Sequence, residues 1–73
     1  MIIVTGASRG IGKIICQRLL AKNQKILGLA RNIDSLNFDA VSCDVSSYDQ
    51  LKQIALQIKK TGVPVTGLIN AAG

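Results

Sequence analysis

The sequence has few aromatic residues, few cysteines and no long run of apolar or basic residues, and each shortage excludes a class of protein. A single Phe, a single Tyr and no Trp leave no aromatic platform on which single-stranded nucleic acid could stack. The two cysteines, Cys16 and Cys43, form no metal-binding or redox spacing. No apolar run approaches the length of a membrane span, and no run of five or more basic residues suggests a nucleic-acid arm.

The composition that remains is that of a small domain with a buried core, or of part of one. Hydrophobic residues make up 48% of the 73 residues, and the formal net charge of +5 comes from scattered Lys and Arg side chains. We expect Cys16 and Cys43 to be small core residues in a reducing cytosol. A first strand that starts at Ile2, with no basic leader or cleavage site, also predicts a cytoplasmic protein without a signal peptide.

Apolar runs alternate with segments of helical spacing along the chain, which predicts an α/β fold. The connection 31–39 is short, with room for about one turn near 34–37. The segments expected to form strands are 2–4, 25–30, 40–43 and 65–69, and the two long helices are expected over 11–22 and from the cap at Ser47 to Gly62.

Both predicted helices carry apolar stripes and end signals. The first should end at Asn23 in a left-handed conformation. The second should begin at a capping box of Ser47 and Gln50, for which Ser46 is the alternative cap, and Gly62 should end it. The residues predicted to face the core are Ile11, Ile14, Ile15 and Leu19 of the first helix and Leu51, Ile54, Ala55 and Ile58 of the second.

The order of these elements predicts a partial Rossmann-type fold. Its doubly wound parallel sheet should have four strands in the order 3-2-1-4, with the two long helices packed on it. Ligands of such sheets bind beyond the carboxyl ends of the strands, where the first strand neighbours the fourth. The loops expected to converge there are 6–12, 31–32, 44–45 and 70–73.

The segment Thr5–Gly12 joins the first strand to the first helix and contains three glycines. Gly6, Gly10 and Gly12 are placed to allow a tight turn, the approach of a pyrophosphate to the main chain, and close packing of helix on strand. A P-loop is excluded because five residues separate Gly6 from Gly12, and Ile14 stands where a Ser or Thr is needed. A glycine-rich turn without a ligand remains the alternative.

Arg31 stands where an NAD-binding chain usually carries an acidic residue for the ribose 2′-hydroxyl, about 20 residues after the glycines. An acid would repel a 2′-phosphate, whereas a guanidinium binds it through forked, charge-assisted hydrogen bonds. Arg9, just before Gly10, could reach the same phosphate. The two arginines predict NADP(H) in preference to NAD(H), and the alternative is that Arg31 is an ordinary surface residue.

The octet Thr5–Gly12 resembles the cofactor loop of the short-chain dehydrogenase/reductase family, whose pattern Thr-Gly-x3-Gly-Ile-Gly is matched at every fixed position. The pair Asp44 and Val45 resembles the family's adenine-edge motif. The resemblance implies that Asp44 accepts from the adenine amino group and that the Val45 N–H bonds a ring nitrogen. From the residues alone, Asp44 is as readily an N-terminal cap for the following helix.

The segment 70–73 resembles the family's motif Asn-Asn-Ala-Gly, with Ala71 in place of the second Asn. This resemblance implies a close approach of the backbone to the nicotinamide-side ribose, with Asn70 bracing the fourth strand. The full set of residues expected to bind the cofactor is Gly6, Ser8, Arg9, Gly10, Ile11, Gly12, Arg31, Asn32, Asp44, Val45, Asn70, Ala71, Ala72 and Gly73.

The resemblance covers the whole chain but only the beginning of the family's fold. Residues 1–73 are therefore expected to be the N-terminal part of a single NADP(H)-binding Rossmann domain. The family's catalytic Ser, its Tyr-x3-Lys pair and its Asn fall beyond residue 73. Tyr48 and Lys52 have the right spacing, but they follow the third strand, whereas the pair belongs on a long helix after the fifth. We expect no catalytic residue and no metal site in this chain.

Two functions remain open at the level of the sequence. The resemblance implies the cofactor-binding part of an enzyme that transfers hydride between nicotinamide and a small carbonyl or alcohol substrate. The alternative is a truncated, non-catalytic nucleotide-binding or interaction module. The expected partners are a dinucleotide cofactor and a second copy of the chain, bound through the open edge of the fourth strand or through helices beyond residue 73, with no nucleic acid and no membrane.

Overall fold

Four strands and two helices follow one another along the chain, and the computed structural model describes them over residues 1–34 and 36–71. Every element lies close to its predicted range, although the fourth strand starts later than expected. In the connection after the second strand, the Leu36 N–H donates to the Ile33 carbonyl oxygen at 3.2 Å. The elements are β1 (Ile2–Thr5), α1 (Gly10–Ala21), β2 (Ile26–Ala30), β3 (Ala40–Ser42), α2 (Tyr48–Thr61) and β4 (Gly67–Asn70).

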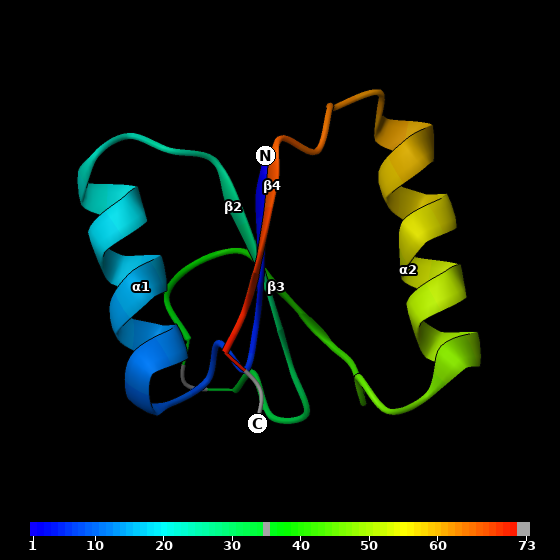
Figure 1. Ribbon diagram of the computed structural model, residues 1–73, viewed down its shortest axis with the longest axis horizontal. Helices are drawn as coiled ribbons and strands as arrows, with labels where there is room; N and C mark the ends of the chain where they lie inside the picture. Colours follow the sequence, from blue (N-terminus) through cyan, green and yellow to red (C-terminus); the bar gives the residue numbers. More distant parts are fainter. Residues whose placement is uncertain (35, 72–73) are drawn as a thin grey trace.

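The strands form one parallel sheet in the order β3-β2-β1-β4, which confirms the predicted Rossmann-type fold. In its register, Ile2 of β1 lies opposite Ile26 of β2 and Gly67 of β4. Figure 1 shows α1 on one face of the sheet and α2 on the other, as right-handed crossovers on either side of a switch point produce. The carboxyl ends of all four strands therefore meet at one end of the molecule.

Two small cores lie on the two faces of the sheet. On the α1 face, the helical residues Ile15, Cys16 and Leu19 pack with Val4 of β1. Both Val4 and Cys16 have no exposed surface. The core on the α2 face consists of the buried residues Leu29, Cys43 and Ile54, with partly buried Leu51 and Ile58 packed against them.

Three residues of the predicted stripes face solvent, so the prediction is wrong at these positions. Ile11 and Ile14 are 73% and 52% exposed, and Ala55 is also exposed. The cause is rotational, because each residue turns by about 100° around a helix. Ile14 lies about 160° round α1 from the buried Gly12, and Ala55 lies about 100° round α2 from the buried Ile54.

The helix ends agree with the predicted local signals, with one exception. Asn23 and Gly62 have φ values of 61° and 73°, in the left-handed region. Ser47 caps α2 by accepting from the Gln50 N–H at 3.3 Å. The reciprocal half of the predicted capping box is not formed, because Gln50 Oε1 accepts a hydrogen bond from the Asp44 N–H at 2.8 Å instead.

Gly28 of β2 lies beside Ala7 of the first loop and Phe38 of the connection after β2. An added Cβ at Gly28 would lie 2.8 Å from the Ala7 Cβ and 2.9 Å from Phe38 Cε2. We expect Gly28→Ala to lower the free energy of unfolding by about 1–3 kcal/mol, because the crowded core must shift to admit the methyl group. Urea unfolding gives this difference. Gly67→Ala is the matched control, because a Cβ at Gly67 would approach Ile2 no closer than 3.7 Å. An equal loss of unfolding free energy in both variants would contradict the packing argument.

Candidate functional site

A groove of about 810 Å³ opens at the carboxyl ends of the strands, at the predicted switch point. It draws residues from all four predicted loops as well as from the strand ends, so the predicted convergence is confirmed for the described part of the chain. The lining residues are Gly6, Ser8, Arg9, Gly10, Ile11, Leu29, Ala30, Arg31, Asn32, Cys43, Val45 and Ala71.

The amino end of α1 borders this groove with unpaired backbone donors. Gly6 and Gly10 have φ values of 66° and 61°, which lets the chain reverse between β1 and α1. Arg9 stands at the N-cap position, where its side chain makes no capping hydrogen bond. Among the described residues, none accepts from the N–H groups of Gly10, Ile11 or Gly12. The first turn therefore presents free donors and the positive end of the helix dipole to an anion.

Gly12 does not line the groove, and its contribution is to bring the helix close to the turn. An added Cβ at this position would overlap the Gly6 carbonyl oxygen and lie 2.7 Å from the Gly6 carbonyl carbon. Only a residue without a side chain fits, so α1 starts against the turn itself. This is the close packing predicted for the third glycine.

Two arginines line the groove, Arg9 before α1 and Arg31 after β2. The Arg31 side chain is 82% exposed, and its Nη2 lies 3.8 Å from Asp44 Oδ1. Its main chain is held more firmly, because Ser42 Oγ donates to the Arg31 carbonyl oxygen at 2.9 Å. Arg31 therefore combines a fixed backbone with a guanidinium that is free to turn towards a ligand.

Val45 lines the groove, and its neighbour Asp44 is not among the lining residues. Asp44 Oδ1 accepts from Ser46 Oγ at 2.7 Å and from the Ser46 N–H at 3.0 Å. These two hydrogen bonds, with a smaller effect of the Arg31 charge, hold the pKa of the Asp44 carboxyl below its usual range. The N-cap of α2 is Ser47 and not Asp44. The Val45 N–H donates to none of the described residues.

The end of β4 is fastened to the end of β1 beside the groove. Thr5 Oγ1 donates to Asn70 Oδ1 at 2.7 Å, and the Ala71 N–H donates to the Thr5 carbonyl oxygen at 3.3 Å. Asn70 thus braces β4 against its neighbour, as the resemblance implied. Ala72 and Gly73 of the predicted motif lie outside the described residues.

Three lining residues, Leu29, Ala30 and Cys43, were expected only as buried strand residues. Each stands at or next to the carboxyl end of a strand, and this position is the signal that could have identified it. Burial raises the pKa of the Cys43 thiol, and the Asp44 charge adds to the effect. Cys43 is therefore an apolar part of the wall and a weak nucleophile.

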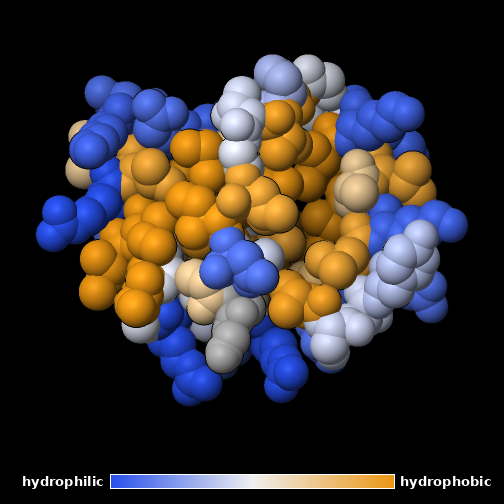
Figure 2. All heavy atoms as spheres, viewed as in Figure 1, coloured by the Kyte–Doolittle hydropathy of each residue, from blue (hydrophilic) through white to orange (hydrophobic). Residues whose placement is uncertain are grey.

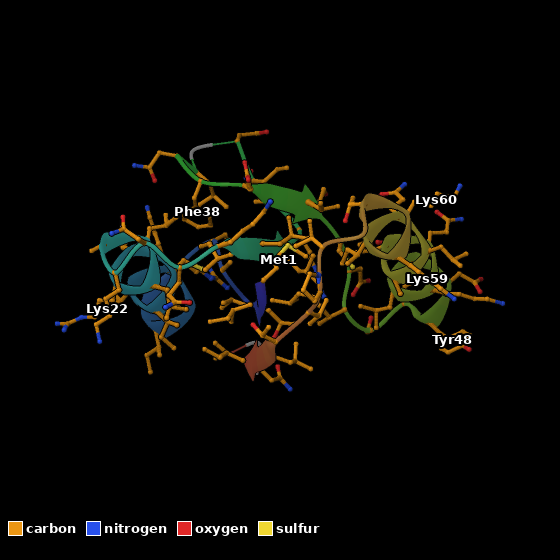
Figure 3. All side chains as sticks on the ribbon, turned by 90° about the horizontal axis from the view of Figure 1, so that it is seen from above. Met1, Lys22, Phe38, Tyr48, Lys59 and Lys60 are labelled. Carbon is orange, nitrogen blue, oxygen red and sulfur yellow. The ribbon has the colours of Figure 1, made fainter. Side chains whose placement is uncertain are left out.

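Tyr48 and Lys52 take no part in the groove. Tyr48 is 76% exposed in the first turn of α2, and Figure 3 shows its ring on the outer side of that helix. Within residues 1–34 and 36–71, no three His, Cys, Asp or Glu side chains gather as metal ligands. Neither helix in that part of the chain has the length and apolar content needed to cross a membrane.

Comparison with known proteins gives the family. The model of the short chain dehydrogenase family matches residues 1–73. The chain is 32% identical to farnesol dehydrogenase of Aedes aegypti, over 97% of this chain and 34% of that protein. It is 33% identical to carbonyl reductase family member 4 of Danio rerio, again over 97% of this chain and 34% of that protein.

Solved structures agree with this assignment. The ligand-free aldohexose dehydrogenase of Thermoplasma acidophilum superposes with a TM-score of 0.88 and 36% identity, over 99% of this chain and 29% of that one. The 4-hydroxyisoleucine dehydrogenase complexed with NADH and succinate superposes with a TM-score of 0.92 and 28% identity, over 100% of this chain and 35% of that one. The chain belongs to the short chain dehydrogenase family, and it spans about a third of the length of these relatives.

The hydrogen bonds to Asp44 make the stability of the chain depend on pH. Because the folded state lowers the pKa of Asp44, its ionised form stabilises the fold at neutral pH. That contribution is lost as the pH falls from the unfolded-state value of about 3.9 through the folded-state pKa. We expect the urea midpoint to fall more steeply on acidification in the native chain than in Asp44→Asn. Asp39→Asn is the control, because no described residue donates to the Asp39 carboxylate. If the urea midpoints of Asp44→Asn and of the native chain depend on pH in the same way, the argument is contradicted.

Proposed function

We propose that residues 1–73 are the N-terminal, cofactor-binding part of a single NADP(H)-binding domain in a short chain oxidoreductase. The observation that carries the proposal is one groove that is bordered by the unpaired amides at the start of α1 and lined by both Arg9 and Arg31. The whole enzyme would transfer hydride between nicotinamide and a small carbonyl or alcohol substrate. The NADH bound to the structurally similar 4-hydroxyisoleucine dehydrogenase supports the nicotinamide dinucleotide class.

The preference for NADP(H) rests on the charges around the groove. Arg9 and Arg31 line it, and none of its described lining residues is acidic. The amides of Gly10, Ile11 and Gly12 would bind the pyrophosphate, and the two guanidinium groups would bind the ribose 2′-phosphate. A carboxylate for the 2′-hydroxyl, which NAD(H) sites usually carry, is missing from the described lining.

The rest of the cofactor would use the remaining loops. Ser8 and Asn32, which line the groove, would offer polar side chains to the phosphates, while Asp44 and Val45 would offer an acceptor and a free N–H to the adenine edge. The segment 70–73, including Ala72 and Gly73, would pass close to the nicotinamide-side ribose. When bound, the nicotinamide supplies or accepts the hydride. The residues of this chain bind and orient the cofactor, and we assign none of them a catalytic step.

The non-catalytic alternative is less well supported, because the relatives that match nearly the whole chain are dehydrogenases and reductases. A cytoplasmic location is part of the proposal. It is supported by the two free thiols of Cys16 and Cys43, both buried and unpaired, as is typical of a reducing compartment.

We also propose that the β4 edge of the sheet is an interface with a second copy of the chain. β4 pairs with β1 on one side only, and Leu68 is 67% exposed. Figure 2 shows a broad apolar face over β4 and the adjoining sides of both helices, with hydrophilic residues around it. The chain exposes 5080 Å², whereas a compact protein of its mass exposes about 4300 Å². The excess is similar to one partner's share of a standard interface, about 800 Å².

Replacement of Arg31 tests the cofactor preference. We expect Arg31→Asp to weaken NADPH binding at least about tenfold and to change NADH binding by no more than about threefold, because a carboxylate repels the 2′-phosphate and accepts from a 2′-hydroxyl. Isothermal titration calorimetry at low salt measures both affinities. Arg18→Asp is the control, since it makes the same charge change at the far end of α1. Equal affinity of the native chain for NADPH and NADH would refute the role of Arg31.

Replacement of Leu68 tests the interface. We expect the native chain to sediment as a dimer and Leu68→Lys to raise the dimer dissociation constant at least about tenfold, because it places a charge in the apolar face. Leu56→Lys is the matched control, since Leu56 is 52% exposed on α2 and lies about 160° round that helix from the buried Ile54. Native chain that sediments as a monomer at millimolar concentration, or equal weakening in both variants, would argue against this interface.

A further inference from the structure

The Gln50 side chain makes a contact that helix capping does not explain. A Gln at the third helical position normally reaches back to the N–H of the N-cap residue. Here Gln50 Oε1 accepts from the Asp44 N–H at 2.8 Å, beyond the N-cap. The Ser47 N–H that it leaves free donates to the Asp44 carbonyl oxygen at 2.9 Å. The first turn of α2 is thus tied to the loop that follows β3.

Hydrogen bonds hold the Asp44 N–H, its carbonyl oxygen and its side-chain carboxylate. Its N–H is held by Gln50 and its carbonyl by Ser47, while Ser46 donates twice to its carboxylate. The preceding residue, Cys43, donates its N–H to the Ala30 carbonyl oxygen of β2 at 2.8 Å. The next residue, Val45, is left with its side chain on the groove wall and a free N–H among the described residues.

We propose that Gln50 is a positioning residue that fixes the turn at Asp44 and Val45 for recognition of an adenine ring. Gln50 itself stands outside the groove and would touch no ligand. Without its acceptor, the Asp44 N–H loses its partner, and the turn gains freedom that a ligand must remove again on binding. The adenine part of this inference rests on the proposed function, and the fixing of the turn rests on the hydrogen bonds alone.

The test uses the whole chain with three variants. Gln50→Ala removes the acceptor, Gln50→Glu keeps one, and Gln53→Ala is the control one turn further along α2 at another exposed residue. Hydrogen exchange of the Asp44 amide, followed by NMR, reports the turn without any ligand. Titrations with 5′-AMP, nicotinamide mononucleotide, NADPH and NADH report recognition.

We expect the Asp44 amide to exchange about three- to tenfold faster in Gln50→Ala, with near-native exchange in Gln50→Glu and Gln53→Ala. We expect 5′-AMP and NADPH to bind about three- to tenfold more weakly to Gln50→Ala, while the ratio of NADPH to NADH affinity stays native because Arg9 and Arg31 are untouched. A merely structural role would weaken nicotinamide mononucleotide equally and would not be rescued by Gln50→Glu.

Different results overturn different claims. Native exchange of the Asp44 amide in Gln50→Ala would overturn the positioning role, whatever the ligands do. Faster exchange with unchanged binding of 5′-AMP and NADPH would overturn the link to adenine. A native chain that binds neither 5′-AMP nor NADPH would overturn the proposed function, while the exchange rates would still decide whether Gln50 holds the turn.

Discussion

A Cβ at Gly12 would overlap the Gly6 carbonyl oxygen, and this close approach of helix to turn is the constraint on which the site depends. It allows α1 to begin within a few residues of the end of β1, with Gly6 and Gly10 in left-handed conformations. The unpaired amides of the first helical turn then lie beside the groove. A larger residue at position 12 would push the helix away and carry these amides out of reach of an anion.

The parallel sheet brings distant loops to the same groove. Hydrogen bonds between neighbouring strand ends hold the loops in place, from Thr5 to Asn70 across β1 and β4, and from Cys43 to Ala30 across β3 and β2. The arginine that we assign to the 2′-phosphate and the turn that we assign to adenine both follow strands on the same side of β1. The adenosine end of a dinucleotide would therefore lie over β2 and β3, and its nicotinamide end over β4.

The sequence was sufficient to predict the strands, their order and the loops of the groove, because hydrophobic runs, glycines and polar strand ends are local signals. It does not predict which face of each helix packs on the sheet. The prediction therefore puts Ile11 and Ile14 in the core, although both are exposed. The partner of Gln50 was also missed. Both outcomes depend on the position of the helix relative to the sheet, which no spacing along the chain records.

The most direct measurement is an NMR titration of the isotope-labelled chain with NADPH, which tests the central claim that the unpaired helix-start amides bind the cofactor's pyrophosphate. We predict the largest shifts at the amides of Gly10, Ile11 and Gly12, with further shifts at Arg31 and Val45. The apolar hollow of about 240 Å³ between α2 and the sheet, which Leu27, Val41 and Ile58 help to line, should stay unchanged. Shifts confined to that hollow, or none at the start of α1, would contradict the account.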